Sequence, residues 1–579
     1  MKKRHIGTYL PEVILLLLCA VWLLYGISLK KGYHMDELLS FELANARFNP
    51  WIVPTQPQGR LAKFVENEID GADAAETRTN LLETVRDVWE RRGQSKLLTY
   101  KADVYDAPVW IDREQFYAYL TVDEKDAFNY LSVYFNVKDD NHPPLHFMLL
   151  HTVSSVFRGQ ISPLMGCGIN LACVLGVMIL LMWLARQFLT LFGQRERGRA
   201  VGLWTAGLYG FSCGAMSTTL LIRMYALVTF FCVALFAIHV RKLYAGRLQM
   251  SAVGADDFSR GNKRLIAVTV LGFWTQYFFL FYCILLAVWT VVYLWRNDRK
   301  REVGAYIRSM VIAALIGLIG FPFAIADVLS SGRGVEALAS FRQGLAGYGE
   351  RLTTFAGILA VRLGIAVLCI VGASLAAGMI GRLVKKQRVC YGTLLSLIGI
   401  PAVGYFLLAA RMSPYMVDRY IMPIFPFCIL FLTVSTCFVV RGRAVFVGVL
   451  VLTLLLQPAM TLRWENPYLY SDYPKQLRVS RMYDTYPCLC VSEGVGYYEN
   501  LLEFMNYPKT LIVKTEELAA GSQEVGETAE LIVLLKDEVD ARAVDRVLEE
   551  QYGLHRQHIV FVGGVYGDRI MLYGRAEEE

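Results

Sequence analysis

Long apolar segments bounded by clusters of lysine and arginine constrain the fold of this 579-residue chain more than any other feature. A run of about 20 apolar residues is long enough to cross the ~30 Å hydrocarbon core of a bilayer as an α-helix. Hydrophobic residues make up 55% of the sequence and charged residues only 19%, a balance that is rare in a soluble protein of this size. The sequence therefore predicts a polytopic α-helical membrane protein.

The apolar runs predict about eleven transmembrane helices. The first run, residues 9–29, follows a basic start at residues 1–5 and is too long for the core of a signal peptide. We therefore interpret it as a retained helix. The remaining runs are residues 163–184, 200–221, 224–240, 265–274, 278–295, 310–328, 354–380, 391–410, 421–440 and 445–462.

The placement of basic residues predicts the orientation of these helices. Residues 144–157 are apolar but cover only ~20 Å as a helix, so we predict an outer-leaflet helix that lies in or dips into the membrane without crossing it. With that choice, the densest Lys/Arg clusters all fall on the cytoplasmic side, together with the N-terminus. Counting residues 144–157 as a crossing would move every one of these clusters outside.

We predict two domains. The first is a membrane module at residues 1–462, whose first extracytoplasmic loop (residues 30–162) contains interfacial helices. Within that loop, residues 81–92 suggest an amphipathic helix and residues 116–122 a strand.

The second predicted domain, residues 463–579, has a soluble composition and is expected to be a small extracytoplasmic α/β domain. Helical patterns at residues 498–505 and 541–552 alternate with apolar β-rich runs at residues 488–491, 511–513, 531–535, 559–562 and 570–572. Cys488 and Cys490 stand two apart on one of these strands, a spacing that bridges poorly, so no disulfide is expected. The basic residues do not form one binding face, so nucleic acid is not an expected partner.

Two acidic motifs could carry chemistry. Asp36 and Glu37 directly follow the first helix, where two adjacent carboxylates can accept a proton from a hydroxyl or hold a divalent ion. The alternative is that they are ordinary acidic residues at a helix exit. Asp140 and His142 precede two prolines where the outer loop returns to the bilayer; the alternative there is a capped helix start.

Arginine and tyrosine pairs stand at two predicted outer helix ends, Arg223 with Tyr225 and Arg419 with Tyr420. Arginine on the outer side is an exception to the rule that basic residues gather on the cytoplasmic side. Its bidentate hydrogen bonds suit a lipid phosphate. The alternative is that each arginine only extends its charged end to the lipid headgroups, beside a tyrosine at the membrane interface. Gln276 and Tyr277 lie in a very short outer hairpin, where interfacial anchoring is the simpler interpretation. Arg362 lies inside an apolar run and needs a partner or a cavity.

Taken in order, these motifs resemble those of GT-C fold glycosyltransferases. Within that class they are similar to the bacterial family-39-like group related to protein O-mannosyltransferases and aminoarabinose transferases. The resemblance covers about residues 1–462. Many relatives have histidine where this chain has Gln276, which weakens a metal or proton role there. The resemblance is carried by Met35-Asp36-Glu37-Leu38, Asp140-Asn141-His142-Pro143-Pro144-Leu145, Arg223-Met224-Tyr225, Thr275-Gln276-Tyr277 and Arg419-Tyr420, the last followed by Pro423 and Pro426.

The resemblance implies a transferase in the bacterial cell membrane that moves a sugar from a polyprenyl-phosphate-linked donor to a hydroxyl of a glycan, lipid or protein acceptor on the extracytoplasmic side. Asp36 would be the general base in an inverting displacement, and Glu37 would orient it or bind the sugar.

The other motif residues would bind the substrates. Asp140 and His142 would support the acceptor or a metal, and Arg223 and Arg419 would offset charge on the departing phosphate. A divalent cation, magnesium or manganese, would be held through Asp36 and Asp140. The substrate-binding set is completed by Tyr225, Gln276, Tyr277 and Tyr420.

A transporter or flippase of lipid-linked glycans is the alternative function. Transporters usually place ionisable groups and broken helices near the middle of the bilayer. In this chain the acidic candidates gather at one predicted interface, which favours the enzyme.

Overall fold

A computed structural model describes residues 9–245, 257–259, 261–329, 347–384, 392–440, 442–521, 523–564 and 567–575, so the basic start at residues 1–5 lies outside the described residues. Contacts divide the chain into two compact units, and each is described by itself. The helical unit comprises Met1–Leu29, Lys138–His146 and Gly166–Tyr468. The sheet unit comprises Lys30–Val137, Phe147–Met165 and Leu469–Glu579.

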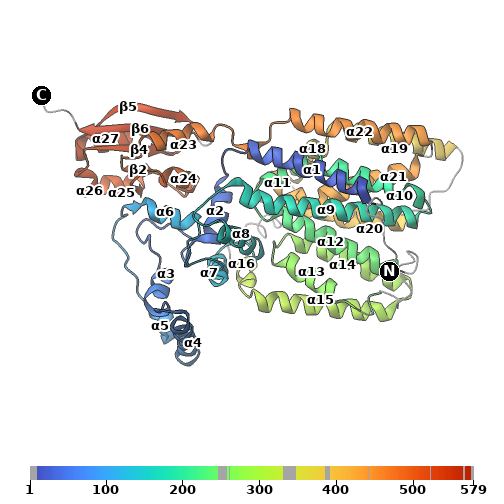
Figure 1. Cartoon of the computed structure of the whole chain (residues 1–579), viewed down its shortest axis with the longest axis horizontal. Helices are drawn as coiled ribbons and strands as arrows, with labels where there is room; N and C mark the ends of the chain where they lie inside the picture. Colours follow the sequence, from blue (N-terminus) through green and yellow to red (C-terminus); the bar gives the residue numbers. More distant parts are fainter. Residues whose placement is uncertain are drawn as a thin grey trace. The chain divides into compact units, whose positions relative to one another are not determined.

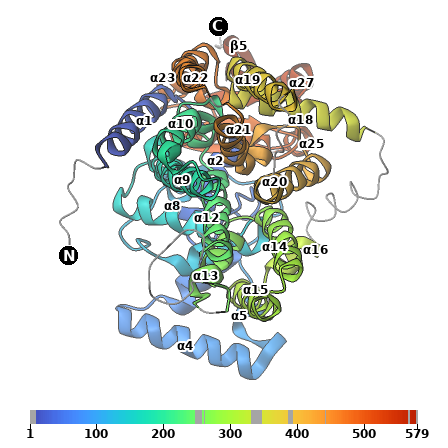
Figure 2. The ribbon, with the colours of Figure 1, turned by 90° about the vertical axis from the view of Figure 1, so that its right-hand side faces the viewer.

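Eight helices among the described residues are long and apolar enough to cross a membrane, which identifies an integral membrane protein. Several lie along one direction in Figure 1, and Figure 2 shows them nearly end-on. Leu17 and Val21 of the first helix are more than 60% exposed, as expected of a face that meets lipid. The helices are α1 (Leu10–Leu29), α9 (Pro163–Leu191), α12 (Tyr225–Leu243), α14 (Phe279–Arg296), α15 (Lys300–Gly320), α20 (Gly392–Met412), the 3-10 helix η6 (Asp418–Ile424) continued by α21 (Phe425–Val439), and α22 (Arg443–Arg463).

A ninth candidate crossing among the described residues is a bent pair of helices. Residues 354–380 were predicted as one continuous run, but α18 (Tyr348–Leu363) and α19 (Ile365–Val384) meet at an angle of 93°. Gly364 joins them with a φ of +92°, a conformation that disfavours any side chain. A Cβ at this position would also lie only 2.8 Å from the amide oxygen of Gln457.

The two other predicted crossings are shorter in the structure. Residues 200–221 form two helices, α10 (Gly198–Gly210) and α11 (Cys213–Leu220), and the hydroxyl of Ser212 caps the second by accepting from the amide of Ala215. Residues 265–273 lie within the 11-residue helix α13 (Lys263–Phe273), and Trp274 is its C-cap. Hydropathy measures the length of an apolar run and does not detect such breaks.

The sheet unit contains the predicted α/β domain. Its six strands lie in the order β1-β3-β2-β4-β6-β5, with β3, β2 and β4 mutually parallel and the other pairs antiparallel. Five strands overlap the predicted runs, whereas β1 comes from the first loop and was not predicted. The strands are β1 (Ile111–Asp112), β2 (Cys488–Val491), β3 (Lys509–Val513), β4 (Glu530–Leu535), β5 (Leu554–Gly563) and β6 (Asp568–Arg575).

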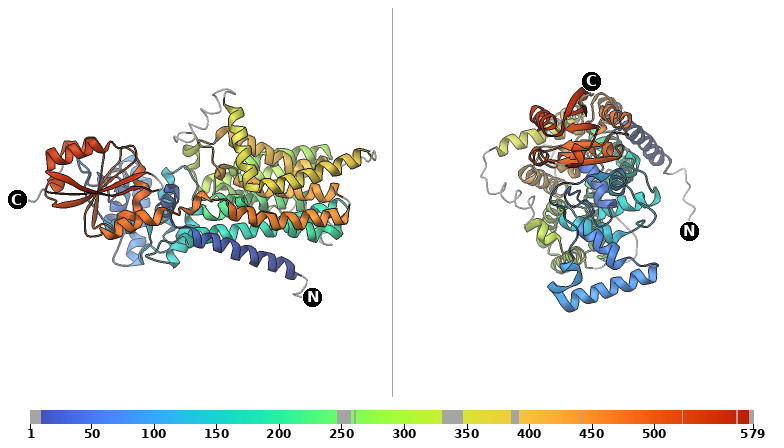
Figure 3. Two further views of the ribbon diagram at one scale, coloured as in Figure 1. Left: turned by 90° about the horizontal axis from the view of Figure 1, so that it is seen from above. Right: turned by 90° about the vertical axis from the view of Figure 1, so that its left-hand side faces the viewer.

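Helices cover both faces of this sheet, as Figure 3 shows. Alternate residues such as Leu489, Val491 and Val533 face a core shared with α27. The intervening residues Cys488 and Cys490 are also buried, and both are free thiols. Burial on both faces explains the continuous apolar runs in the sequence. The helices of this region are α23 (Tyr473–Met482), η8 (Gly496–Asn500), α24 (Leu501–Phe504), α25 (Thr515–Ala520), α26 (Gln523–Gly526) and α27 (Ala541–Tyr552).

The first loop is mainly helical. Helix α4 includes most of the predicted segment 81–92, and α8 is as short as predicted, with 12 residues. The predicted strand at residues 116–122 is wrong, because Phe116, Tyr119 and Leu120 are buried at helical spacing in α6. The helices here are α2 (Met35–Asn45), α3 (Arg60–Phe64), the π-helix η2 (Val65–Ile69), α4 (Ala74–Arg91), α5 (Lys96–Thr99), α6 (Arg113–Leu120), α7 (Tyr130–Asn136) and α8 (Leu145–Val156).

A buried carboxyl group makes the stability of the sheet unit depend on pH. Glu503 is fully buried and accepts a hydrogen bond from the Tyr473 hydroxyl at 3.0 Å. Burial, aided by the charge of Asp568, raises the pKa of Glu503 from 4.5 to about 8. The folded state therefore holds a proton that the unfolded state releases between these two pH values.

The free energy of unfolding is expected to fall as the pH rises from 4.5 to about 8, by up to about 1.4 kcal/mol per pH unit from this group. Thermal unfolding of the full chain between about pH 5 and about pH 8.5 measures the effect. Glu503→Gln should remove this part of the pH dependence, whereas Glu516→Gln, at an exposed position of α25, should not. An unchanged pH dependence in Glu503→Gln would contradict the assignment.

Candidate active site

The adjacent carboxylates Asp36 and Glu37 open helix α2 in the sheet unit. His34 is the N-cap, and its Nδ1 accepts a hydrogen bond from the Asp36 amide at 3.0 Å. The Glu37 carboxylate accepts one from the His34 amide at 2.7 Å, which completes a capping box. Negative charge is also favourable at this end of a helix because of the backbone dipoles.

Glu37 is used to hold the chain in place. Its carboxylate forms an ion pair with Lys30 at 2.9 Å, and neither side chain is exposed. The ammonium group of Lys30 also lies over the ring of Tyr470, 4.9 Å from its centre. The ion pair and the capping box together fix the turn that leads into α2.

Asp36 is the more exposed of the two carboxylates, with 20% of its side chain accessible to solvent. One carboxylate oxygen lies 3.6 Å from Nδ1 of His34. Because this nitrogen accepts from the Asp36 amide, the neutral ring carries its proton on Nε2. Of the two predicted catalytic carboxylates, Asp36 is thus the one that is accessible to a solute.

In the helical unit, Asp140 and His142 lie together before α8. The Asp140 carboxylate and Nδ1 of His142 are 2.9 Å apart, and 12% of the Asp140 side chain is exposed. Burial alone would raise the pKa of Asp140, but His142 and Arg223 together hold it below its usual range. Asp140 is therefore ionised at neutral pH.

Arg223 lies in the short break between α11 and α12 and is 6% exposed. The backbone that leads to it is held by Asn170, whose amide donates to the Leu221 carbonyl at 2.6 Å. Burial, aided by the charges of Arg223 and His142, lowers the pKa of His146 to about 3, so this ring is neutral. The sequence analysis missed His146, although its spacing of four from His142 could have revealed it.

The hairpin between α13 and α14 belongs to the same cluster. The Leu145 amide donates to the Trp274 carbonyl at 3.0 Å, which ties the start of α8 to this hairpin. Gln276 is buried, and the Tyr277 hydroxyl donates to Asp327 in α16 (Ala324–Leu329) at 2.5 Å. Burial, aided by the carboxylates of Asp327 and Asp140, raises the pKa of Tyr277. Asp327 was missed because it falls within the predicted apolar run 310–328.

Tyr225 and Tyr420 are also brought together. Their rings pack edge-on with centres 6.2 Å apart, and Phe278 packs against Tyr420 at 5.5 Å. The guanidinium group of Arg419 lies over the ring of Tyr420, 5.4 Å from its centre. Hydrogen bonding from the Tyr405 hydroxyl to the Tyr420 carbonyl, at 3.0 Å, fixes the backbone here.

Arg362, flagged from the sequence, has a partner. It donates to Asp418 at 2.6 Å and lies over the indole of Trp464, 3.9 Å from the ring centre. The second oxygen of Asp418 accepts from the Tyr468 hydroxyl at 2.5 Å. Asp418 directly precedes Arg419, so this ion pair fixes the start of η6.

The Tyr277→Phe variant is expected to be less stable by about 1–3 kcal/mol, because the buried carboxylate of Asp327 loses a hydrogen-bond donor. Thermal unfolding of the detergent-solubilised protein measures the loss. Tyr415→Phe, at an exposed tyrosine, is the matched control. Equal stability of the two variants would show that the hydrogen bond between Tyr277 and Asp327 contributes little.

Metal binding finds no support in the donor set. Among the residues that the structure describes, no group of three or more His, Cys, Asp or Glu side chains is placed to hold a metal ion. Asp36 and Asp140, the two predicted metal ligands, belong to different units.

Comparison with known proteins finds a remote likeness to solved structures and none to curated sequences. No family model and no curated protein matches the sequence. The structure is similar to two crystal structures of ArnT from Cupriavidus metallidurans, one in the apo state and one bound to undecaprenyl phosphate. The sequence identities are 10% and 11% and the TM-scores 0.43 and 0.45; each match covers 75% of this chain and 88% of the other. ArnT is an aminoarabinose transferase with the GT-C fold, the group that the motifs resemble.

Proposed function

We propose that the chain is a membrane glycosyltransferase that moves a sugar from a polyprenyl-phosphate-linked donor to an acceptor hydroxyl on the extracytoplasmic side. The proposal is supported by the positions of the candidate residues at the ends of helices. Asp36, Asp140, Arg223, Tyr277 and Arg419 all occupy helix starts or the segments between helices, and none lies in the middle of a long apolar helix. The phosphate of a lipid-linked donor lies at headgroup depth, where transmembrane helices end.

In the proposed reaction, Asp36 removes the proton of the acceptor hydroxyl as its oxygen bonds to the anomeric carbon. The bond from that carbon to the donor phosphate breaks, and the electron pair leaves with the phosphate. Arg223 and Arg419 offset the charge that develops there, the kind of stabilisation that often dominates catalysis.

Glu37 supports Asp36 by fixing the capped turn through Lys30 and His34. Asp140, paired with His142, is assigned to the binding of the acceptor.

Transport of a lipid-linked glycan is the second candidate function, and the broken crossing at Gly364 favours it. Helix breaks near buried charges form substrate sites in many transporters. Here the protein's own groups fill the break, since Gln457 donates to the Leu363 carbonyl at 3.1 Å and Asp418 neutralises Arg362. The transferase is therefore the better-supported function.

Mass spectrometry of cell-envelope glycans, with and without this protein, tests the proposal. A sugar substituent that is lost with the protein and restored by it supports transfer. The purified protein in liposomes should then form a covalent product from a lipid-linked sugar. Movement of a labelled glycolipid across the bilayer with no covalent product would instead support the transporter.

A further inference from the structure

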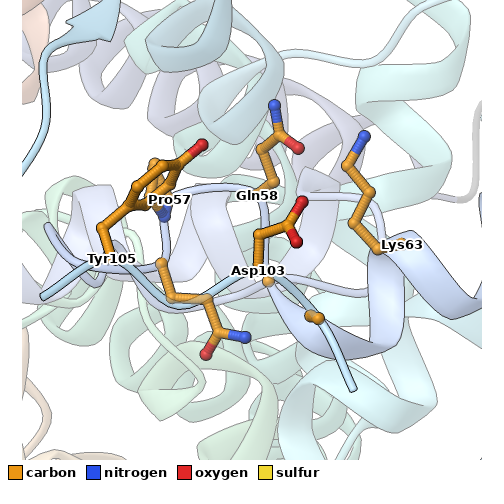
Figure 4. Close-up of a pocket in the computed structure, with 8 residues that line it drawn as sticks. Pro57, Gln58, Lys63, Asp103 and Tyr105 are labelled. Carbon is orange, nitrogen blue, oxygen red and sulfur yellow. The ribbon is translucent and has the colours of Figure 1, made fainter. Parts of the chain in front are cut away.

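The depression of the first loop shown in Figure 4 is too small to hold a ligand. It lies beside Gln58 and Asp103 and has room for about one water molecule. Both side chains are exposed, so they do not enclose a solute. The same loop carries an exposed apolar patch at α7 and α8, which is a candidate interaction surface.

The patch is one surface built from two segments of the sheet unit. The Phe128 amide donates to the Ser155 hydroxyl at 2.8 Å. The hydroxyls of Tyr130 and Thr152 are hydrogen-bonded at 3.0 Å. These bonds hold the beginning of α7 against the end of α8. The patch consists of five large apolar side chains, each 39–63% exposed: Phe128, Tyr130, Leu131, Val156 and Phe157.

The amphipathic pattern of α8 is inverted. Four of the six residues on its buried face are polar: the face consists of His146, Phe147, Leu150, His151, Ser154 and Ser155. Its outer face is apolar apart from one threonine, and consists of Leu145, Met148, Leu149, Thr152, Val153 and Val156. A helix in water shows the opposite pattern. Polar side chains turned inward are typical of a helix that meets lipid.

The one hydroxyl on the outer face of α8 is satisfied within the protein. Thr152 donates to the Met148 carbonyl at 2.7 Å, so the Tyr130 hydroxyl is the donor in the bond between the two side chains. Neither hydroxyl therefore needs a water molecule as a partner. This face of the protein can leave water without the cost of an unpaired polar side chain.

The patch lies close along the chain to a candidate membrane crossing. Phe157 stands six positions before Pro163, where α9 begins. Six residues span at most about 20 Å when fully extended, less than the ~30 Å hydrocarbon core of a bilayer. Leu164, the second residue of α9, is 54% exposed, as expected of a side chain that meets lipid. The patch is thus continuous with the part of the chain that enters the membrane.

A cation borders the patch. Arg158 directly follows Phe157, and its guanidinium group donates to the Ser155 carbonyl at 3.1 Å. It lies 3.9 Å from Glu124, whose side chain is 92% exposed, so solvent screens this ion pair. An arginine held beside an apolar surface suits the phosphates at the boundary between headgroups and acyl chains.

We propose that this patch binds the lipid bilayer, with its apolar side chains at the boundary between headgroups and acyl chains and Arg158 among the phosphates. The inverted pattern of α8 favours lipid over water, and the short connection to α9 brings lipid within reach. Lipid binding by the patch does not depend on the proposed transferase function.

Hydrogen bonds join the patch to helix α2, whose first turn carries Asp36. From α7, Asn136 donates to the Ala46 carbonyl at the end of α2, at 2.6 Å. From α2, Asn45 donates to the Ser154 hydroxyl of α8 at 3.1 Å. The depth at which the patch enters the lipid therefore also sets the depth of α2.

Photocrosslinking from single positions of the full chain, in liposomes of an alkyne-tagged phosphatidylcholine, tests the proposal. p-Benzoylphenylalanine in place of Leu131 or of Val156 should form a lipid adduct on irradiation. Ile559 in the edge strand β5 is 55% exposed and is the matched control, where the same probe should form several-fold less adduct. The proposal is overturned if position 131 gives no more lipid adduct than position 559, or if irradiation joins it to a second copy of the chain instead.

The same proteins separate this surface from the transferase function. Lipid contact requires no catalysis, so Asp36→Asn with the probe at position 131 should form as much lipid adduct as the chain that keeps Asp36. A normal lipid adduct without sugar transfer by the wild type would refute the transferase and leave the surface standing. Normal transfer without a lipid adduct at positions 131 and 156 would refute the surface alone.

Discussion

Sugar transfer by Asp36→Asn is expected to be about 10²–10⁴-fold slower than by the wild type, the range measured for loss of a general base. Asparagine has nearly the same shape as aspartate, but its amide cannot take the proton of the acceptor hydroxyl. The fold should survive, because the N-terminus of α2 is capped by the side chains of His34 and Glu37 and not by that of Asp36. The initial rate of transfer in proteoliposomes, at saturating donor and acceptor, measures the effect.

Two further variants make this result specific. Glu90→Gln, at an exposed position of α4, should transfer at the wild-type rate. Glu37→Gln should instead lose stability by about 3–5 kcal/mol, because it removes the negative charge of the buried ion pair between Lys30 and Glu37. A normal transfer rate in well-folded Asp36→Asn would refute the base assignment. Wild-type stability in Glu37→Gln would refute the structural role of the ion pair between Lys30 and Glu37.

Much of the fold could be predicted from the sequence because its signals are local. The length of an apolar run identified most crossings, and alternation with helical patterns predicted the α/β region, where β2 and α27 have the predicted bounds. The short length of α8 was equally clear, since it follows from counting residues.

Other features depend on partners far away in the chain, which a single sequence does not reveal. Strand β1 pairs with β3, so Ile111 lies opposite Thr510. The break at Gly364 depends on Gln457, whose side chain both crowds the glycine and satisfies the Leu363 carbonyl. Such pairings determine the helix and strand boundaries that the hydropathy pattern did not predict.

For the candidate site, the sequence supplied the residue types and the structure distinguished their environments. Asp36 and Glu37 look alike in the sequence, yet one is partly exposed and the other is buried against Lys30. Asp327 looked like part of a membrane segment until the Tyr277 hydroxyl was found to donate to it. Burial and pairing, which decide the chemical role of a carboxylate, are properties of the folded chain.

The Arg362→Leu variant is expected to be less stable than the wild type by about 3–5 kcal/mol, and Asp418→Leu by a similar amount, because each leaves a buried charge unpaired. The double variant Arg362→Leu/Asp418→Leu should lose far less than the sum, since neither charge remains. Thermal unfolding of the four proteins in one detergent completes the double-mutant cycle. Additive losses would show that the two residues do not act as a pair.

Measuring the rate of sugar transfer for the same four proteins shows whether the ion pair positions Arg419 or only stabilises the fold. Asp418 precedes Arg419 and also accepts from the Tyr468 hydroxyl, so the ion pair holds the start of η6 where Arg419 is presented. The double variant should therefore be stable but slow in transfer, with a reduced kcat, because Arg419 is no longer held against Tyr420. Tyr468→Phe, which keeps the ion pair, should lie between the double variant and the wild type. If the double variant transfers at the wild-type rate, the ion pair only stabilises the helical unit and does not position Arg419.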